Sequence, residues 1–377
     1  MKVLHINRNY LTSPLHQVMM DHLDKTAAES VVFAPTEDKA LSLIQPNPNV
    51  IVSECFSRAD RFFYGKKQRK IRKALESSAQ VPEFDLIHAY TLFTDGNCAM
   101  ELSKKYGIPY VVAVRNTDVN DFFKKFPWLR KRGVEILRCA AKVFFLSPVY
   151  RDQVFAHYIP EELKPQIEKK TEIVPNGIDD FWLKMPPEEL LQERLNRLQK
   201  KELRVIYAGR IDRNKNIPST IQALEQMAAD GWKVALTVVG KVADEKVFEQ
   251  IRRSPLLHYV PAQPKEPLRE LYRQHDIFVM PSFTETFGLV YAEAMSQGLP
   301  VVYSEGQGFD GQFPEGTVGY HADPHSVAQI RDAIEKTIAE YQGIAGVCPG
   351  LAQRFCWGQI VNRYEQIYRQ IIDGEIR

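Results

Sequence analysis

The sequence contains 377 residues, with 44% hydrophobic and 25% charged side chains and a formal net charge of +2. This length suits two domains that each bury their own core, and the ordinary composition excludes a low-complexity chain. The near-neutral balance excludes the strong basic field typical of nucleic-acid binding, so we expect no nucleic-acid partner. The N-terminal apolar run is too short for a signal peptide, and no stretch reaches the roughly eighteen apolar residues of a membrane span. We therefore expect a cytoplasmic protein.

Five cysteines are scattered along the chain, and none forms a C-x-x-C pair. Their odd number and wide spacing argue against a disulfide framework or a zinc site, and favour buried thiols in a reducing compartment. They are Cys55, Cys98, Cys139, Cys348 and Cys356.

The first half of the chain alternates short β-branched runs with helical patterns. The runs are nearly continuously apolar, as is typical of parallel strands buried on both faces. Amphipathic stretches at Asn97–Tyr106 and Val134–Ala141 separate some of them. This alternation predicts a doubly wound parallel sheet. The expected strands are Val3–Asn7, Val31–Ala34, Val50–Ser53, Leu86–Ala89, Tyr110–Val114, Val143–Leu146 and Glu172–Val174.

The same alternation restarts after a polar, helical stretch at Pro187–Lys201. The second set of expected strands is Arg204–Ala208, Val234–Val239, Leu257–Val260, Ile277–Met280 and Val301–Tyr303. The expected helices between them are Ile217–Ala229, Lys246–Arg252, Leu268–His275 and Leu289–Ser296.

These patterns predict an α/β protein of two Rossmann-like domains, with residues 1–181 in the first and 182–356 in the second. Ligands bind at the carboxyl ends of the strands in this fold class, here in a cleft between the domains. We expect residues 357–377 to return to the first domain, with a helix at Trp357–Ile372. No G-x-G-x-x-G follows the first strand of either half, which disfavours a dinucleotide oxidoreductase. The face of the last helix expected to be buried contains Ile360, Tyr364, Ile367 and Ile371.

The segment Pro281–Met295 follows an expected strand and leads into a helix. The peptide N–H groups from Thr286 to Leu289 lie at the helix N-terminus, where phosphate or sugar oxygens can bind. Glu285 precedes the helix and Glu293 lies two turns inside it, so both carboxylates can face one side and bond vicinal hydroxyls. The alternative is a helix-end charge at Glu285 and a solvated side chain at Glu293.

A second polar segment follows the first strand of the second half. Gly209 ends that strand, and Arg210 and Lys215 follow in its loop. A guanidinium and an ammonium on a strand-end loop fit a diphosphate. The alternative is an ordinary solvated basic loop.

At these segments the chain resembles the retaining glycosyltransferases of sequence family 4, which have the GT-B fold. The resemblance covers the second domain almost entirely and the first more loosely. It rests on motifs in the family's order, namely Val174-Pro175-Asn176-Gly177-Ile178-Asp179, Gly209-Arg210 with Lys215-Asn216, Val238-Val239-Gly240, and Glu285-x7-Glu293.

The resemblance implies a role for each matching position. Arg210 and Lys215 would bind the diphosphate of a nucleotide-sugar donor, Glu285 the transferred sugar, and Glu293 the ribose. The donor would be a UDP- or GDP-sugar, the acceptor a glycan or lipid-linked precursor, and neither a cofactor nor a metal would be required. Further donor contacts are expected from Gly209, Ala262, Thr286, Phe287, Gly288 and Leu289.

The resemblance also implies retention at the anomeric carbon. In hydrolases, retention normally needs a carboxylate nucleophile near that carbon. No such residue stands out here, so we favour a front-face reaction in which the leaving phosphate takes the acceptor proton.

The first half departs from the family pattern at two places. Thr12-Ser13-Pro14-Leu15-His16 replaces the usual Gly-Gly pair, and Arg115 stands where many members have a histidine. Arginine stays protonated and cannot act as a general base. Arg115 can bind an anionic sugar or acceptor, or pair with Asp118, and we include both among the candidate site residues. His88, at another strand end, is either an active-site or a structural histidine.

Two segments of the first half interleave basic and aromatic residues, Arg58–Lys73 and Phe122–Arg132. Basic side chains near anionic lipid and aromatic rings at headgroup level favour membrane contact. We therefore expect a peripheral protein on the inner face of the plasma membrane with a lipid-linked or membrane-proximal acceptor. The alternative is two solvated helices whose aromatic rings point into the core.

Two other kinds of function fit the same fold. One is another GT-B enzyme, such as a nucleotide-sugar 2-epimerase or a phosphorylase. The other is a non-catalytic subunit that binds a sugar nucleotide, although the intact set Arg210, Lys215, Glu285 and Glu293 argues against lost activity.

Overall fold

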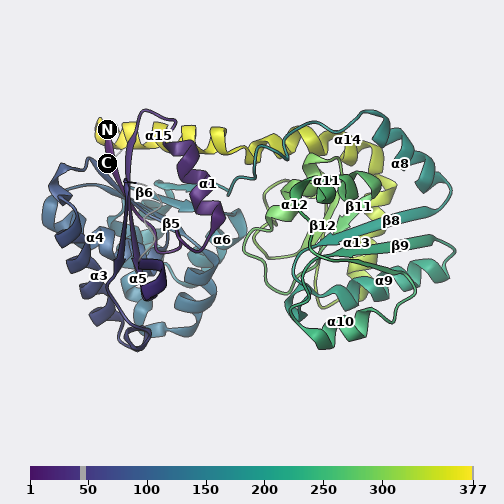
Figure 1. Cartoon of the computed structure of the whole chain (residues 1–377), viewed down its shortest axis with the longest axis horizontal. Coiled ribbons are helices and arrows are strands. Elements are labelled where there is room, and N and C mark those ends of the chain that lie inside the picture. The colour runs from purple at the N-terminus through teal and green to yellow at the C-terminus, as the bar shows by residue number, and fades with distance from the viewer. Residues whose placement is uncertain (43–47, 376–377) are drawn as a thin grey trace. The chain divides into compact units, whose positions relative to one another are not determined.

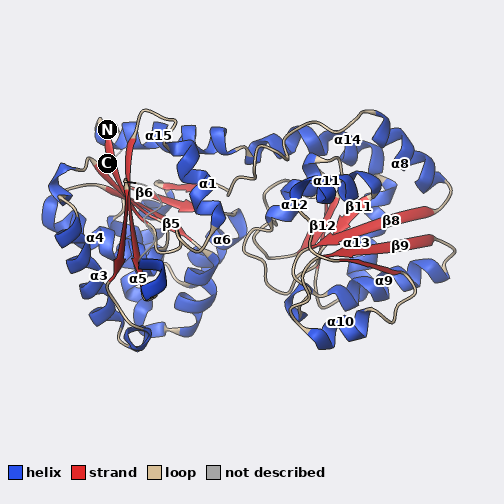
Figure 2. Ribbon diagram, in the orientation of Figure 1, coloured by secondary structure: helices blue, strands red, loops and turns tan. Residues whose placement is uncertain are grey.

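The computed structural model describes residues 1–42 and 48–375. The chain divides into two compact units (Figure 1). Unit 1 comprises Met1–Leu146, Tyr150–Gly177 and Trp357–Arg377, and unit 2 comprises Ser147–Val149 and Ile178–Cys356. Each unit contains one parallel sheet flanked by helices, so the predicted α/β, doubly wound architecture is confirmed (Figure 2).

The sheet of unit 1 has seven parallel strands in the order β3-β2-β1-β4-β5-β6-β7. Every residue of its strand β5 is buried, because helices cover both faces of the sheet. The strand order reverses between β1 and β4, the position where open α/β sheets place their ligands. The strands are β1 (Lys2–Ile6), β2 (Glu29–Thr36), β3 (Val50–Glu54), β4 (Leu86–Ala89), β5 (Tyr110–Val114), β6 (Lys142–Phe145) and β7 (Thr171–Ile173).

The helices of unit 1 lie mostly in the connections between these strands. They are α1 (Pro14–Leu23), α2 (Lys39–Ser42), α3 (Tyr64–Ser78), α4 (Asn97–Tyr106), α5 (Arg130–Cys139), α6 (Pro148–His157, whose first two residues belong to unit 2) and α7 (Lys164–Glu168). Shorter helical segments used below are η1 (Arg58–Phe62), η3 (Leu92–Gly96), η4 (Asp118–Phe123) and η5 (Pro127–Leu129).

The last helix, α15 (Trp357–Ile372), belongs to unit 1 although it follows unit 2 in the chain. It lies beside α1 (Figure 1). All four residues of its expected apolar face are buried, and they share one hydrophobic cluster with the sheet. The hydroxyl of Tyr368 on α15 lies 2.6 Å from Nδ1 of His88 on β4. The predicted return of the chain to the first domain is therefore confirmed.

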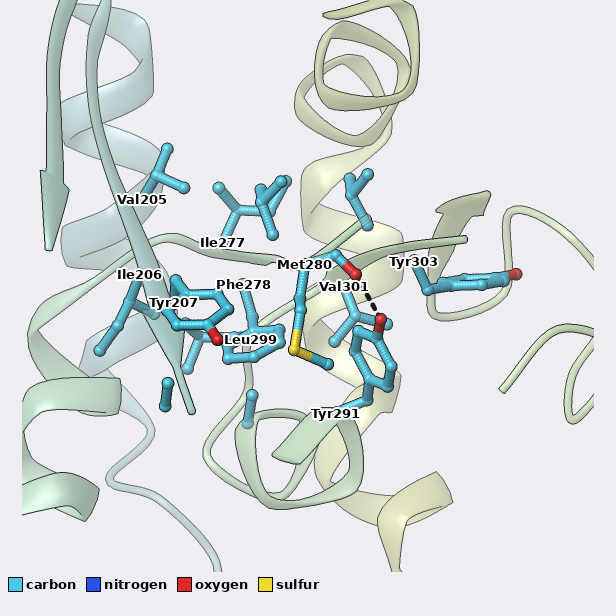
Figure 3. Packing of buried hydrophobic residues seen from close by; sticks show 14 of the residues in the cluster. Val205, Ile206, Tyr207, Ile277, Phe278, Met280, Tyr291, Leu299, Val301 and Tyr303 are labelled. Carbon is cyan, nitrogen blue, oxygen red and sulfur yellow. Dashed lines mark hydrogen bonds between the residues drawn. The ribbon is translucent and has the colours of Figure 1, made fainter. Parts of the chain in front are cut away.

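The sheet of unit 2 has six parallel strands in the order β10-β9-β8-β11-β12-β13, and its order reverses between β8 and β11. Its core is packed with large side chains such as Tyr207, Phe278 and Tyr291 (Figure 3). The strands are β8 (Glu202–Ala208), β9 (Lys233–Val239), β10 (Leu257–Val260), β11 (Ile277–Val279), β12 (Val301–Ser304) and β13 (Gly319–Ala322). Its helices are α8 (Glu189–Gln199), α9 (Ile217–Ala229), α10 (Glu245–Ile251), α11 (Lys265–Gln274), α12 (Leu289–Ser296), α13 (Val327–Ala339) and α14 (Tyr341–Ala352).

Candidate functional site

In unit 2, the loops after β8 and β11 meet where the strand order reverses. Asn214 joins them, because its side chain donates to the carbonyl of Thr284 (2.8 Å) and accepts from the N–H of the same residue (3.0 Å). Asn216 is buried and donates to the carbonyls of Pro281 (3.1 Å) and Pro324 (2.6 Å). These bonds hold the basic loop of unit 2 against the segment that leads into α12.

Lys215 and Glu285 form an ion pair at this meeting point. Their Nζ and Oε2 atoms lie 2.6 Å apart, with 16% and 12% of the two side chains exposed. The other carboxylate oxygen of Glu285 accepts the N–H of Thr286 at 3.0 Å. The backbone N–H of Glu285 donates to the side-chain oxygen of Gln307 (3.0 Å). The structure thus brings together two predicted site residues that lie 70 positions apart in the chain.

The N-terminus of α12 adjoins this ion pair. Gly288 precedes the helix with φ +74°, and no side chain caps the helix there. A β-carbon at Gly288 would lie 2.3 Å from the ring of Tyr291, so the close turn requires glycine. The Tyr291 hydroxyl in turn donates to the carbonyl of Met280 at the end of β11 (Figure 3). The first-turn N–H groups of an α-helix have no partner within the helix and favour an anion.

Glu293, inside α12, is half-buried. Burial raises the pKa of its carboxyl to about 7, with Lys265 opposing and Asp179 adding to the shift. Lys265 itself forms an ion pair with Asp179. The Glu293 side chain makes no hydrogen bond to a described residue, so it can bond a ligand hydroxyl in either protonation state.

Arg210 presents a charge that is much more exposed than the Lys215–Glu285 pair. Its side chain is 72% exposed and lies 3.1 Å from the carboxylate of Asp212. The backbone of this residue is fixed, since its carbonyl accepts the hydroxyl of Tyr207 (2.5 Å). The guanidinium can therefore turn toward a ligand while the loop that bears it stays in place.

The remaining predicted residues of unit 2 lie at the carboxyl edge of the same sheet. Gly209 donates to the carbonyl of Val239, and a β-carbon at Gly240 would lie 1.7 Å from the Gly209 carbonyl oxygen. Close approach of these two strand ends therefore requires glycine. Ala262 is exposed in the loop after β10, at the far end of this edge.

The two candidate residues of unit 1 occupy a different environment. Asp118 is buried and accepts three backbone N–H groups, from Leu92 (3.0 Å), Phe93 (3.2 Å) and Arg115 (2.9 Å). Burial raises the pKa of this carboxyl to about 6, although the three hydrogen bonds oppose the shift. Asp118 thus holds η3 and the start of η4 in place.

The guanidinium of Arg115 donates to the carbonyl of Tyr90 (3.0 Å) and to the side chain of Asn176 (2.9 Å). From Arg115 the Asp118 carboxylate accepts the backbone N–H and no guanidinium N–H, although the guanidinium charge still acts to lower the pKa of Asp118. Of the two expected uses of this arginine, a direct ion pair with Asp118 is not formed, and the two groups interact through the Arg115 backbone and through the guanidinium charge at longer range. Contact with an anionic ligand stays a prediction, since the side chain is only half-buried.

His88 is the centre of a buried aromatic group in unit 1. It is fully buried, and its ring stacks on Tyr90 with 4.1 Å between centroids. Burial holds its pKa well below the ordinary value. In the segment that replaces the family's Gly-Gly pair, His16 is likewise buried and bonds the side chain of Asn7 (3.0 Å). Of the two interpretations of His88, the structure supports the structural one.

Some contributors to the site were not predicted from the sequence. Asn216 belonged to a recognised motif but had no assigned role, whereas Gln307 and Tyr207 gave no signal beyond their residue type. Among residues 1–42 and 48–375, no group of three or more His, Cys, Asp or Glu side chains is placed to hold a metal ion. No helix in the same ranges is both long and apolar enough to cross a membrane.

Both halves of the chain are similar to known proteins. The family models for Glycosyl transferases group 1 and for Glycosyltransferase Family 4 match residues 191–343 and 18–180, respectively. D-inositol 3-phosphate glycosyltransferase of Paenarthrobacter aurescens (strain TC1) is 26% identical over 310 residues, which is 77% of this chain and 74% of that protein. Sucrose-phosphate synthase from Thermosynechococcus elongatus has a TM-score of 0.73 at 19% identity and covers 99% of both chains. Anabaena HepE, solved in complex with UDP, has a TM-score of 0.71 at 19% identity, covering 97% of this chain and 99% of that one.

Proposed function

The chain belongs to the group 1 glycosyltransferases of sequence family 4, and we propose that it transfers a sugar from a UDP-sugar to a lipid-linked or cell-surface acceptor with retention of anomeric configuration. Glycosyltransferase activity with a nucleotide-sugar donor follows from the family. UDP is favoured over GDP as the donor nucleotide because HepE, which has the same fold, binds UDP.

The observation that supports this proposal most strongly is the Lys215–Glu285 ion pair beside the open N-terminus of α12. Each partner keeps bonding capacity for a ligand, because an ammonium has three N–H groups and a carboxylate has about four acceptor positions. Lys215 faces the diphosphate in our proposal, and Glu285 accepts hydroxyls of the transferred sugar. Arg210 turns onto the diphosphate, and Glu293 bonds the ribose.

The chemical step needs stabilisation of negative charge on the leaving diphosphate. Arg210, Lys215 and the N–H groups at the start of α12 supply it without a divalent metal. In the front-face reaction, the bond from the anomeric carbon to the phosphate oxygen breaks and a bond to the acceptor oxygen forms on the same face. The acceptor hydroxyl gives its proton to the leaving phosphate, so no protein base is needed.

Calorimetric titration with UDP tests the donor site. Lys215→Ala and Arg210→Ala should each weaken UDP binding by about 10- to 100-fold, because each removes a charge-assisted hydrogen bond. Arg213→Ala is the matched control, since Arg213 is an exposed cation of the same loop. Wild-type UDP affinity in both site variants would show that the diphosphate binds elsewhere.

The acceptor part of the proposal is supported by the surface of unit 1. Phe62, Phe63 and Trp128, from the two basic-aromatic segments, are 79%, 63% and 71% exposed. Phe123 alone among the large aromatics of these segments is fully buried in the core. Exposed aromatic rings beside basic side chains favour contact with an anionic membrane surface.

Co-sedimentation with vesicles tests this contact. Binding should increase with anionic lipid content and decrease at high salt, because basic side chains are screened by salt. Equal, negligible binding to neutral and anionic vesicles at low salt would contradict membrane contact and leave the glycosyltransferase activity unaffected.

A further inference from the structure

A cavity of about 620 Å³ lies at the carboxyl edge of the sheet in unit 1. Two of its lining residues, Arg8 and Thr94, follow β1 and β4, the strands between which the sheet order reverses. Lys67 enters it from α3. The position is the one where open α/β sheets bind ligands, and none of the donor-site residues of unit 2 contributes to this lining.

Four aromatic side chains line the cavity and are called its aromatic wall here: Phe62, Phe122, Phe126 and Trp128. Phe126 and Trp128 pack edge to face with 5.3 Å between their centroids, and Phe122 stacks on Phe93. Phe122, Phe126 and Trp128 thus support one another, and Phe62 and Trp128 are largely exposed. An apolar wall left open to water indicates a surface that binds an apolar ligand.

The lining of the cavity also contains a buried cation. Lys67 is only 9% exposed, and its Nζ lies 4.4 Å from the centre of the Phe56 ring. The Arg8 guanidinium lies 5.4 Å from the same ring and 3.9 Å from the carboxylate of Glu37. Lys67 itself has no carboxylate within 4.0 Å among the described residues, and burial lowers its pKa to about 8. Glu37, the partner of Arg8, also lines the cavity. Because a buried charge is costly unless it is paired, the Lys67 ammonium marks a place for an anion.

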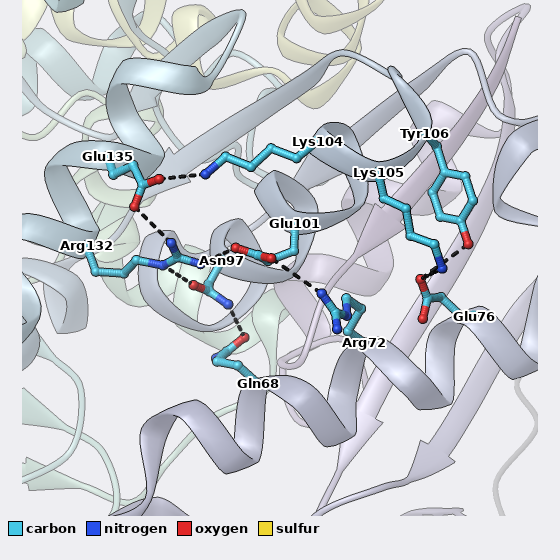
Figure 4. Close-up of polar contacts among 10 residues, drawn as sticks. All are labelled: Gln68, Arg72, Glu76, Asn97, Glu101, Lys104, Lys105, Tyr106, Arg132 and Glu135. Carbon is cyan, nitrogen blue, oxygen red and sulfur yellow. Dashed lines mark hydrogen bonds and ion pairs between the residues drawn. The ribbon is translucent and has the colours of Figure 1, made fainter.

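Several neighbouring basic side chains are paired with carboxylates. Arg72 and Arg132 both pair with Glu101, and Arg132 also pairs with Glu135 (Figure 4). These bonds hold α3 against α4 and α5, and so fix the helix that presents Lys67. Further pairs are Lys66 and Lys70 with Asp60, Lys104 with Glu135, and Lys105 with Glu76.

We propose that this cavity binds a phosphorylated lipid, with the phosphate between Arg8 and Lys67 and the hydrocarbon chain along the aromatic wall. Inorganic phosphate alone would leave the wall exposed, and a neutral lipid would leave the buried ammonium with only the more distant carboxylates of Glu37 and Asp95 among the described residues and no anion in contact. The inference rests on the proposed function, because it identifies the chemistry of the membrane-linked acceptor. A specific lipid site in the cavity differs from general adsorption of the basic segments to a membrane, because it requires particular lining residues.

Calorimetry on the full chain tests the proposal with three probes, each below its critical micelle concentration where it has one: dodecyl phosphate, inorganic phosphate and dodecyl maltoside. Dodecyl phosphate should bind, and the other two should bind at least tenfold more weakly. Lys67→Met and Trp128→Ala should each weaken dodecyl phosphate binding about tenfold or more. The matched controls are Lys73→Met, an exposed cation of α3, and Phe63→Ala, an exposed aromatic outside the lining. Both controls should bind as the wild type does.

Equal losses in Lys67→Met and Lys73→Met would overturn the cavity site, because only surface charge would then matter. Phosphate binding as tightly as dodecyl phosphate would overturn the lipid assignment. UDP titration of the same variants separates this result from the donor proposal. UDP affinity should be unchanged in Lys67→Met and Trp128→Ala, which also shows that they are folded. If the wild type did not bind UDP, the proposed donor site would be contradicted. The dodecyl phosphate titration would still test the cavity by itself.

Discussion

The two parallel sheets of this protein leave different chemistry at their carboxyl edges. In unit 2 the strand-end loops present an ion pair, an exposed arginine and an uncapped helix N-terminus. In unit 1 the predicted polar residue Asp118 is buried in the structure, and the cavity at this edge is lined mainly by aromatic residues with two cations and Glu37. The same architecture therefore gives one edge suited to a polar nucleotide and another suited to an amphiphile. The difference shows that strand-end position alone does not make a polar residue available to a ligand.

Glu285→Gln should have the largest effect, and it tests whether the edge of unit 2 is the catalytic one. We expect turnover to fall by about 10²–10³-fold, similar to the loss of a charge-stabilising group, while UDP affinity changes far less. Steady-state kinetics and UDP titration measure the two quantities. Glu305→Gln is the matched control, because Glu305 is exposed at the end of β12 on the same edge. A similar loss of turnover in both variants would remove the special role of Glu285.

Asp118→Ala tests whether the buried carboxylate of unit 1 supports the fold and does not bind a ligand. Removing this carboxylate leaves three buried N–H groups without an acceptor, so we expect a loss of about 3 kcal/mol in the free energy of unfolding. Asp118→Asn keeps an oxygen and should lose less. Urea unfolding measures both, and UDP affinity should not change. Full stability in Asp118→Ala with lost turnover would mean that Asp118 acts in catalysis instead.

Glu293→Gln should have a smaller effect, on nucleotide binding. We expect UDP affinity to fall about tenfold, the order of one hydrogen bond to a ribose hydroxyl. UMP and UDP should lose affinity by the same factor, since both contain the ribose. A loss of turnover with unchanged nucleotide affinity would exchange the proposed roles of Glu285 and Glu293.

Acid pH should weaken unit 1 through its buried histidines. Burial lowers the pKa of His5 to about 3 in the folded state, whereas the unfolded chain titrates near the ordinary value of 6.5. The unfolded state therefore binds more protons below pH 6.5, and the stability present above that pH is lost as pH falls toward 3. The loss from this histidine is about 1.4 kcal/mol at pH 5.5. His5→Gln should reduce the acid sensitivity in urea unfolding measured from pH 7.5 to 5.5, and an unchanged profile would contradict the assignment.

Much of the fold follows from local patterns. The bounds of β4, β5, β10, α4, α9, α12 and α15 agree with the predicted ranges, because nearly continuous apolar runs and amphipathic stretches are strong signals. Strand β13 was not predicted, because Gly319-Tyr320-His321-Ala322 contains no β-branched residue. It is an edge strand that pairs with β12, and this pairing is not visible in the local sequence.

The sequence by itself determined the residue types of the proposed donor site and their order, because Gly209-Arg210, Lys215-Asn216 and Glu285-x7-Glu293 lie in contiguous motifs. The tertiary structure decided which of them meet. Lys215 pairs with Glu285 because β8 and β11 are adjacent in the sheet, a strand order that local sequence does not specify. Likewise, only packing placed Lys67 and Arg8 beside Phe56 while it paired most neighbouring cations. Burial and the choice of ion-pair partner depend on residues distant in the chain, and these decide whether a charge supports the fold or faces a ligand.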